Sequence, residues 1–394
     1  MKEIYSNINI IGGGLIGAAT ALSLSSLGYK ITVLEKGPAH KFNNSNKDER
    51  TVAISEGTKL YLEKIGVWNE INKFSEPIKK IKIIDRKPNN LIDFNNKRRN
   101  SNLGYIAKNK KILDVIYKHL NKNPDIKIFN ETKIENIEYK NDTVITNGNF
   151  FKIKSNLNIA ADGKNSSIKK LLKTTYFSKN YFKKALVLTF SHSLNHNNTA
   201  YEFFYNHGPL AILPMQKEND KYLSSIVWTN ESNYLESINN LDEKNLISIL
   251  NKKTINSVGK INKIYSKQLF PISAHLNTRF YEKRTIYVGD SAHSVHPIAG
   301  QGWNLGMKDV EVVYKVLNKY KFLGIEPGTS SFCKEYHNDT FYRAYRLYQL
   351  TDKLDYIFQN ENLLSYYARI TGSGLIQRSK KLKNAISDFA MGFN

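Results

Sequence analysis

The order of apolar and polar positions predicts a buried strand, a helix and a second buried strand at the beginning of the chain. Residues 8–11 read Ile-Asn-Ile-Ile, residues 18–27 are mostly small or apolar, and residues 31–34 read Ile-Thr-Val-Leu. Two short apolar runs separated by glycines and a helix-length segment are typical of a βαβ unit. Such units build parallel sheets, so we expect an α/β domain here.

Two kinds of pattern interleave along the rest of the chain. A helix is expected over residues 110–120, and from residue 307 onward the pattern is mostly helical, apart from a turn near 324–328. Between these helices, strand-like runs recur in residues 81–101, 127–161, 186–228 and 285–288. The interleaving predicts that a β-rich domain is inserted into a nucleotide-binding domain.

We therefore predict a mixed α/β fold with a Rossmann-like nucleotide-binding domain, an interleaved β-sheet substrate domain and a helical C-terminal region. The nucleotide-binding domain is expected to be discontinuous and to comprise residues 1–75, 102–178 and 276–325. The β-rich domain is expected to comprise residues 76–101 and 179–275, and the helical region residues 326–394.

Composition excludes some classes of protein. The 394 residues are 41% hydrophobic, which is enough for a sizeable core, and the formal net charge is +23. Lys and Arg are dispersed along the chain, so a general compositional bias explains the charge best, and attraction to anionic lipid is the main alternative. No zinc-finger spacing or RNA-binding signature appears, so no nucleic-acid partner is expected.

The expected location is cytoplasmic. The single cysteine, Cys333, permits no intramolecular disulfide and fits a reducing compartment. The beginning of the chain offers no cleavable signal, and no long uninterrupted apolar run predicts a membrane span. Contact with a membrane would therefore be peripheral, on its inner face.

The glycines after the first strand fit the pattern G-x-G-x-x-G at Gly12, Gly14 and Gly17. The first permits a tight turn, the second lets a pyrophosphate approach the backbone, and the third lets the helix pack on the strand. Glu35 ends the second strand, where a carboxylate can bind ribose hydroxyls. The alternative is a mere packing turn. We add the neighbours Leu15, Ile16 and Lys36 to the predicted cofactor site.

Two later strands also end in a small residue and an aspartate. Asp162 follows one of them, and Gly289 with Asp290 follows the other, where a nucleotide could reach the carboxyl end of the strand. Residues 297–306, Pro-Ile-Ala-Gly-Gln-Gly-Trp-Asn-Leu-Gly, then provide free backbone N–H groups and open a helix whose N-terminus favours negative charge.

These motifs resemble those of the flavoprotein aromatic hydroxylases with a single dinucleotide-binding domain, and more narrowly those of the ubiquinone-biosynthesis hydroxylases. The most specific stretch is residues 288–310, with Gly-Asp-Ser-Ala-His, His-Pro and Gly-Gln-Gly-x-Asn-Leu-Gly in series. The likeness covers nearly the whole chain, because further matches occur at residues 50–55, 103–105, 208–214, 351–354, 358 and 390–392.

The resemblance implies an FAD-dependent monooxygenase that hydroxylates the aromatic ring of a polyprenylated phenol. NADPH or NADH would reduce the flavin, and a flavin C4a-hydroperoxide would transfer one atom of molecular oxygen. A lipophilic substrate implies peripheral contact with an anionic membrane and with other quinone-biosynthesis proteins. A helix face within residues 369–383 could make this contact, although a plain solvated face is the alternative.

The expected cofactor residues come from all the motifs together. They are Gly12, Gly14, Leu15, Ile16, Gly17, Glu35, Lys36, Arg50, Asp162, Gly289, Asp290, Pro297, Gly300, Gln301, Gly302 and Asn304. No catalytic base is assigned, and His293, Pro297 and Gln301 are candidates for the face of the flavin ring. His293 and His296 lack a carboxylate or cysteine partner at useful spacing, so no metal is expected.

Two other functions stay open at this point. A hydroxylase of a small soluble aromatic acid would need a positively charged clamp for the substrate carboxylate in the β-rich domain. A flavin-binding assembly subunit would bind FAD without turnover. The aromatic residues Phe203, Trp228 and Phe270 either line a substrate cavity or, more commonly for such residues, pack in a sheet core.

Overall fold

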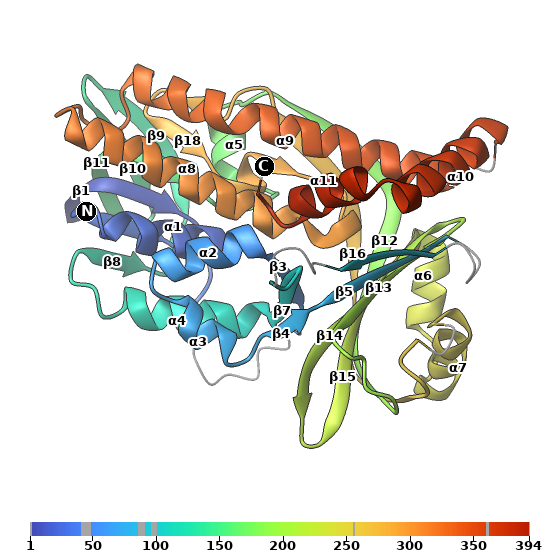
Figure 1. The fold of residues 1–394 in the computed structure, drawn as a ribbon. Coiled ribbons are helices and arrows are strands. Elements are labelled where there is room, and N and C mark those ends of the chain that lie inside the picture. Colours follow the sequence, from blue (N-terminus) through green and yellow to red (C-terminus); the bar gives the residue numbers. More distant parts are fainter. Residues whose placement is uncertain are drawn as a thin grey trace.

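The computed structural model describes residues 2–40, 49–85, 91–95, 101–254, 257–359 and 362–393. Two large sheets dominate the molecule, as the ribbon shows (Figure 1), and long helices from the C-terminal part of the chain lie across both. The predicted mixed α/β class is confirmed.

The first sheet has the parallel core that the βαβ pattern predicts. Its strand order is β17-β18-β11-β1-β2-β8, and the strands from β18 to β8 run parallel. The bounds are β1 Lys2–Ile11, β2 Ile31–Leu34, β8 Ile126–Phe129, β11 Phe151–Ala160, β17 Tyr281–Glu282 and β18 Thr285–Tyr287. An antiparallel meander of β9 (Ile134–Lys140) and β10 (Thr143–Gly148) extends β11.

Helices cover both faces of this sheet, and its central strands are therefore buried on both sides. All four residues of β2 are buried, which is typical of a parallel strand between two helical layers. Helix α1 (Leu15–Ser25) packs against α4 (Asn109–Leu120) and α8 (Gly302–Phe322). The predicted helix at 110–120 is confirmed to within one residue.

The second sheet is mostly antiparallel, in the order β19-β16-β12-β15-β14-β13-β5-β6. The bounds are β5 Lys80–Asp85, β6 Leu91–Asn95, β12 Tyr176–His192, β13 Thr199–Tyr205, β14 Gly208–Glu218, β15 Lys221–Glu231, β16 Ile261–Asn277 and β19 His293–Ser294. Helices α6 (Ser232–Asn239) and α7 (Glu243–Thr254) cover its outer face (Figure 1).

A small third sheet connects the two large ones. It consists of β3 (Thr51–Ser55), β7 (Gly104–Lys108) and β4 (Glu76–Ile78), in the order β3-β7-β4. Short helices α2 (Glu56–Lys64) and α3 (Trp68–Asn72) follow β3. Helix α5 (Ser167–Leu171) follows β11.

Long helices form the C-terminal part of the chain, as predicted. They are α9 (Ser330–Gln359), α10 (Leu363–Arg378) and α11 (Lys380–Ala390), and the predicted turn near 324–328 separates α8 from α9. Figure 1 shows that the chain turns back after α10, so that the C-terminus lies in the middle of the molecule. There the amide of Gly57 donates a hydrogen bond to the carbonyl of Met391 (2.8 Å). No helix in the described ranges is both long and apolar enough to cross a membrane.

Successive side chains of a strand point to opposite faces of the second sheet, so neighbouring aromatic residues lie either in the core under α6 and α7 or on the cavity side. Phe203 and Trp228 are fully buried on the outer face, against Leu235 and Leu246 of the two covering helices. Neither lines the central cavity described below, so the core alternative is correct for both, and Phe204 is the residue that faces inward. Phe270 lies outside the cavity wall and contacts the guanidinium of Arg50 (5.3 Å to the ring centre).

We predict that Phe203→Ala lowers the free energy of unfolding by about 3–5 kcal/mol, because it leaves a cavity in a dry core. Phe177→Ala is the control, since that side chain is 63% exposed and its removal should cost under about 0.5 kcal/mol. Urea unfolding followed by circular dichroism measures both. Equal effects of the two substitutions would contradict this assignment of the core.

Candidate active site

A large cavity of about 2020 Å³ lies between the first sheet and the inner face of the second. Ligand pockets usually measure about 300–1,000 Å³, so this one has room for more than one bound molecule. One end is formed by Gly14, by the residues after β18 and by the N-terminus of α8. The other end is formed by the inner faces of β5, β6, β13 and β14 and by α9 and α11.

Gly12 and Gly17 are required by the protein itself. Gly12 has a φ of +106°, and a Cβ there would lie 2.4 Å from the carbonyl oxygen of Ala161. A Cβ on Gly17 would lie 1.9 Å from the carbonyl oxygen of Gly12. These close approaches bring α1 against the ends of β1 and β11, and side chains at either position would force them apart.

Gly14 and Gly302 are different, because no protein atom lies within 4 Å of a Cβ built on either of them. Gly14 has a φ of −67°, which any residue can adopt, and both glycines line the cavity. Neither backbone strain nor packing against the chain therefore explains glycine at these positions. Close approach of a ligand to the backbone explains both, as a dinucleotide site requires.

The N-termini of the two helices that begin at the cavity, α1 and α8, favour the binding of a negatively charged group. Neither α1 nor α8 has a side chain that caps its N-terminus or an acidic residue in its first turn. Their first N–H groups are therefore available to a ligand, and the helix dipoles favour an anion there. This fits a pyrophosphate at α1 and a reduced, anionic flavin ring at α8.

Glu35 holds the glycine turn in shape. Its carboxylate accepts hydrogen bonds from the amides of Gly13 (2.6 Å) and Gly37 (2.7 Å). The Tyr117 hydroxyl donates to the Gly13 carbonyl (2.9 Å), and a Cβ on Gly13 would collide with that hydroxyl. Gly13 was not among the predicted site residues, although the run of three glycines pointed to it. Lys36 is exposed and lies outside the cavity wall.

Asp290 lines the cavity at the end of the strand-like run 285–288. Its side chain is accessible from the cavity, yet the surrounding protein keeps it poorly hydrated and raises its pKa. The positive charges of Lys164, Lys169 and Arg50 and the nearby His293 oppose this shift. The carboxylate is thus available as a hydrogen-bond acceptor for a cofactor hydroxyl.

His293 does not reach the face of the cavity, contrary to the expectation for a flavin-ring candidate. It is buried, and its Nε2 is 2.7 Å from Oδ2 of Asp309, which also accepts from the Gly289 amide (2.9 Å). The role that this position supports is to fix the turn that carries Asp290. Asp309 was not among the predicted site residues, although it falls within the matching stretch 288–310, because its role depends on how α8 packs against the turn after β18.

His296 lies close to a different carboxylate. Its Nε2 lies 3.3 Å from Oδ1 of Asp355 on α9, and burial lowers the pKa of its imidazole to about 3. The two histidines of the motif therefore contact different carboxylates. Among the residues that the structure places, no group of three His, Cys, Asp or Glu side chains could hold a metal ion.

The remaining predicted residues divide into cavity and support positions. Asp162 accepts from the amides of Ser167 (2.7 Å) and Ile168 (3.3 Å), so it caps a turn and does not line the cavity. Asn304 lines the cavity and also joins α8 to β3, because it accepts from the Ser55 amide (2.9 Å). The other predicted residues on the cavity wall are Leu15, Ile16, Arg50, Pro297, Gly300 and Gln301. Gly289 is buried behind the wall, against Ile16.

The inner face of the second sheet makes the far end of the cavity apolar. Most of the lining residues alternate along the strands, and Tyr201 also reaches the cavity; the alternating residues are Ile81, Ile83, Ile92, Phe94, Ala200, Glu202, Phe204, Pro209, Ala211, Leu213, Val227 and Thr229. Helix α11 closes the cavity with Ile386, Phe389 and Ala390. Glu202 is the one charged residue that the described part of this sheet contributes to the cavity, and no local pattern in residues 199–205 identifies which face it lies on.

These features define a flavoprotein of the FAD-dependent monooxygenase class. The family described as "FAD binding domain" matches residues 5–339, and the chain belongs to this family. Ubiquinone hydroxylase UbiL of Rhodospirillum rubrum is 27% identical over 390 residues, covering 98% of this chain and 90% of the relative. Ubiquinone biosynthesis monooxygenase COQ6 of Danio rerio is 25% identical over 442 residues, covering 99% and 90%.

Solved structures show the same fold. The p-nitrophenol 4-monooxygenase PnpA of Pseudomonas putida superimposes with a TM-score of 0.79 at 18% identity, covering 99% of this chain and 98% of that one. PqsL of Pseudomonas aeruginosa, in complex with 2-aminobenzoylacetate, has a TM-score of 0.76 at 17% identity and covers 94% and 100%. The predicted cofactor, FAD, follows from this family.

We predict that Gly14→Val gives a folded protein without flavin. A Cβ at this position projects into cavity space with no protein atom within 4 Å, so we expect the new side chain to block the pyrophosphate without disturbing the fold. Flavin released on heat denaturation and the far-ultraviolet circular dichroism measure the two effects. Gly17→Val is the contrast, since its side chain collides with backbone and should prevent folding. A yellow Gly14→Val protein would contradict this role of Gly14.

Proposed function

We propose that the chain hydroxylates the aromatic ring of a polyprenylated phenol in ubiquinone biosynthesis. The observation that carries this proposal is the apolar chamber that continues from the cofactor end of the cavity. The total volume of about 2020 Å³ leaves room for a long apolar substrate beside the dinucleotide. Relatives named as ubiquinone hydroxylases, matching nearly the full length, support the same substrate class.

The charge of the chamber disfavours a small aromatic acid as the substrate. Such an acid needs a cation to hold its carboxylate. In the described part of the second sheet, the inner face carries no Lys or Arg, and Glu202 is negative. Arg50, Arg346 and Lys353 line the cavity from other elements.

The cofactor would lie along the residues of the first sheet. The amides at Gly14 and the N-terminus of α1 would hold the pyrophosphate, Glu35 the ribose end, and Asp290 a hydroxyl of the ribityl chain. The segment from Pro297 to Gly302 would lie against the ring. Bound FAD, reduced by NADPH or NADH, supplies the activation of molecular oxygen and the oxygen atom that enters the ring.

The chain's own side chains position the ring and exclude water. The apolar sheet face and the aromatic rings of Phe204 and Phe389 surround the substrate, so that few waters remain near the reacting carbon. Phe204 stacks on Phe358 of α9, with 3.7 Å between ring centres, and limits the chamber on that side. The prenyl tail would extend past these rings along Leu347 and Leu354.

A gene deletion tests this function. We expect a polyprenylated phenol that lacks one ring hydroxyl to accumulate in the deletion strain, detected by mass spectrometry of lipid extracts. Wild-type protein should restore the quinone and Gly14→Val protein should not. An unchanged quinone pool with no accumulated precursor would refute the assignment. Purified holoenzyme that binds FAD but never oxidises NADPH with a prenylated phenol would indicate the assembly-subunit alternative.

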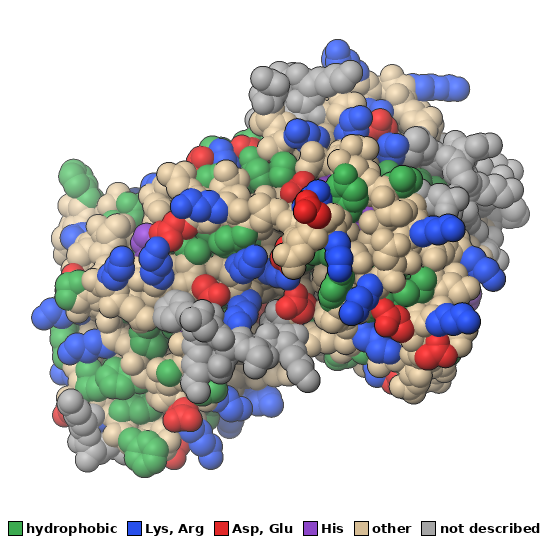
Figure 2. Space-filling view, turned by 90° about the horizontal axis from the view of Figure 1, so that it is seen from below, with side chains coloured by type: hydrophobic (Ala, Val, Ile, Leu, Met, Phe, Trp, Pro, Cys, Tyr) green, Lys and Arg blue, Asp and Glu red, His purple; other side chains and the backbone are tan. Residues whose placement is uncertain are grey.

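Peripheral membrane contact is a separate part of the proposal, and α11 supports it. Its inner residues close the cavity, and Lys380 and Lys381 are exposed on the outside. Elsewhere Lys and Arg are dispersed among Asp and Glu on the face shown in Figure 2. A basic helix over an apolar chamber would let a lipid substrate enter from an anionic surface. Contacts with other quinone-biosynthesis proteins would follow from the same location.

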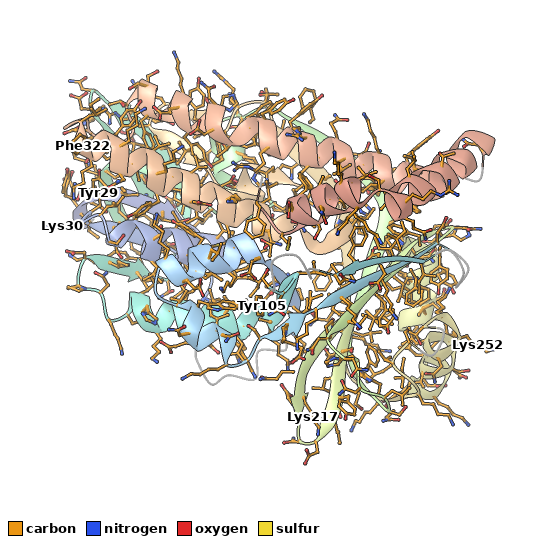
Figure 3. All side chains as sticks on the ribbon, viewed as in Figure 1. Tyr29, Lys30, Tyr105, Lys217, Lys252 and Phe322 are labelled. Atoms are coloured by element: carbon orange, nitrogen blue, oxygen red, sulfur yellow. The ribbon has the colours of Figure 1, made fainter. Side chains whose placement is uncertain are left out.

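Charge reversal tests the contact. Lys380→Glu with Lys381→Glu should weaken binding to vesicles containing anionic lipid by about 30-fold or more in a cosedimentation assay, since each basic residue near the surface contributes about 1 kcal/mol. Lys217→Glu with Lys252→Glu changes the net charge equally at exposed sites remote from α11 (Figure 3) and should change binding much less. If both double variants lose vesicle binding to the same extent, the binding depends on net charge alone and not on α11.

A further inference from the structure

Glu202 is a carboxylate on an otherwise apolar wall. It lies on β13, and alternation places Ala200 and Phe204 on the same side of the strand. Its direct neighbours across the sheet are Ala211 on β14 and Ile83 on β5, which also line the cavity. Within the described part of the chain, its side chain has no hydrogen-bond donor and no cation beside it.

A partnerless carboxylate in such surroundings opposes folding. Removal from water disfavours the charged form, and no described residue donates a compensating hydrogen bond to Glu202. Burial alone raises the pKa of its carboxyl to about 7, so protonated and ionised forms coexist near neutral pH. Groups in this condition are typical of sites that exchange a proton with a ligand.

The position of Glu202 along β13 relates it to the cofactor end. Ala200 packs in one apolar cluster with Ala53 of β3 and Met391 of the C-terminal segment, and β3 follows the predicted flavin-contacting Arg50. Residues two apart on a strand are about 7 Å apart. Glu202 therefore lies about 7 Å along the strand from Ala200, which packs beside β3, and about 7 Å from Phe204 on its other side. This spacing leaves room for one aromatic ring between the predicted flavin site and Phe204.

We propose that Glu202 accepts the hydrogen bond of the substrate's ring hydroxyl and takes up its proton while the ring is hydroxylated. This inference rests on the proposed function. The phenol O–H bond breaks and a carboxyl O–H bond forms, with no change in oxidation state. The electron pair left on the phenol oxygen increases electron density at the ortho and para carbons, where an electrophilic oxygen attacks. The bound cofactor is the oxidant that supplies this oxygen atom. The attacked carbon then loses its hydrogen as a proton to solvent, and Glu202 returns the first proton to the phenol oxygen.

Other charged groups reach the cavity from other elements. They are His40, Arg50, Lys110, Asp290, Arg346 and Lys353. The described parts of β5 and β14 place no charged side chain beside Glu202 on this face, and Asp85 is in register with Phe204 instead. Asp290 also has a raised pKa, so a pH profile must be compared between variants to separate the two carboxyls.

Glu202→Gln in the FAD-loaded enzyme is the test, because it keeps the shape and removes the proton acceptor. We expect kcat to fall about 100-fold with a smaller change in KM. In the wild type, kcat should fall as the pH drops through about 7, since the carboxylate is lost there. In Glu202→Gln this dependence should disappear. The control is Glu231→Gln, an exposed carboxylate on β15 that pairs with His207, and it should behave like the wild type.

A readout without turnover uses an alkylated nitrophenol, whose phenol and phenolate forms differ in absorbance. Bound to wild-type holoenzyme above pH 7 it should show the hydrogen-bonded, phenolate-like spectrum, and in Glu202→Gln the neutral phenol spectrum. Identical spectra and identical pH profiles in the two proteins would overturn the role of Glu202. Failure of the wild type to hydroxylate any prenylated phenol would overturn the proposed function, and the spectra would still decide the role of Glu202.

Folding stability checks the premise. The folded pKa of Glu202 lies above its ordinary value of 4.5, so the group destabilises the fold as the pH rises from about 4.5 to about 7, and the loss is complete above that. Glu202→Gln should therefore raise the Tm at pH 8, with a much smaller rise near pH 4.5. A lower Tm at pH 8 would mean that the carboxylate has a stabilising partner, and it would count against the proposal.

Discussion

The cofactor end of the cavity depends on one close approach of backbone to backbone. The carbonyl of Gly12 fits against Gly17, and Gly12 itself fits against the carbonyl of Ala161, with no space for a Cβ in either place. This contact brings the first turn of α1 against the ends of two neighbouring parallel strands. Because the carboxyl ends of parallel strands share one edge, the same contact puts the helix N-terminus where β18 delivers Asp290. Without these glycines, the site would lack both its anion-binding helix and its spatial relation to Asp290.

The sequence predicted the first sheet well because its constraints are local. A buried strand, a glycine turn and a following acid occupy a few dozen residues, and each has a distinct pattern. The division into domains stays a prediction, and β19, which lies in a segment assigned to the nucleotide-binding domain, pairs with β16 of the second sheet. The sequence did not predict α6 and α7, and the two 17-residue strands β12 and β16 were seen in part or not at all. The burial of these helices and strands depends on contacts with residues far away in the chain, and a local sequence pattern carries no information about such contacts.

Some parts of the candidate site were easier to predict from the sequence than others. Gly14 and Gly302 were predicted as cofactor residues because glycine is informative there, and both line the cavity with open space beside the backbone. Side chains were harder, because their direction depends on tertiary contacts. His293 was placed over the flavin ring from its motif, yet Asp309 on α8 holds it inside the protein. Conversely, Glu202 was overlooked because alternation alone does not tell which face of a strand meets a cavity and which meets a helix.

The two faces of β13 have different roles: one face contributes to the stability of the fold and the other to the choice of substrate. Outward residues such as Phe203 join a dry core under α6 and α7, and inward residues meet a chamber that a ligand must fill. An ionised carboxylate on that inward face repels a substrate that carries a carboxylate of its own, and it attracts a neutral phenol through its O–H group. The surrounding Ile, Phe and Val side chains favour an apolar tail and make a hydrophilic acid costly to bind. Charge sign and apolar area therefore favour the same proposed substrate, a neutral phenol with a long hydrocarbon chain, whose hydroxyl would offset the cost of the carboxylate by donating a hydrogen bond to it.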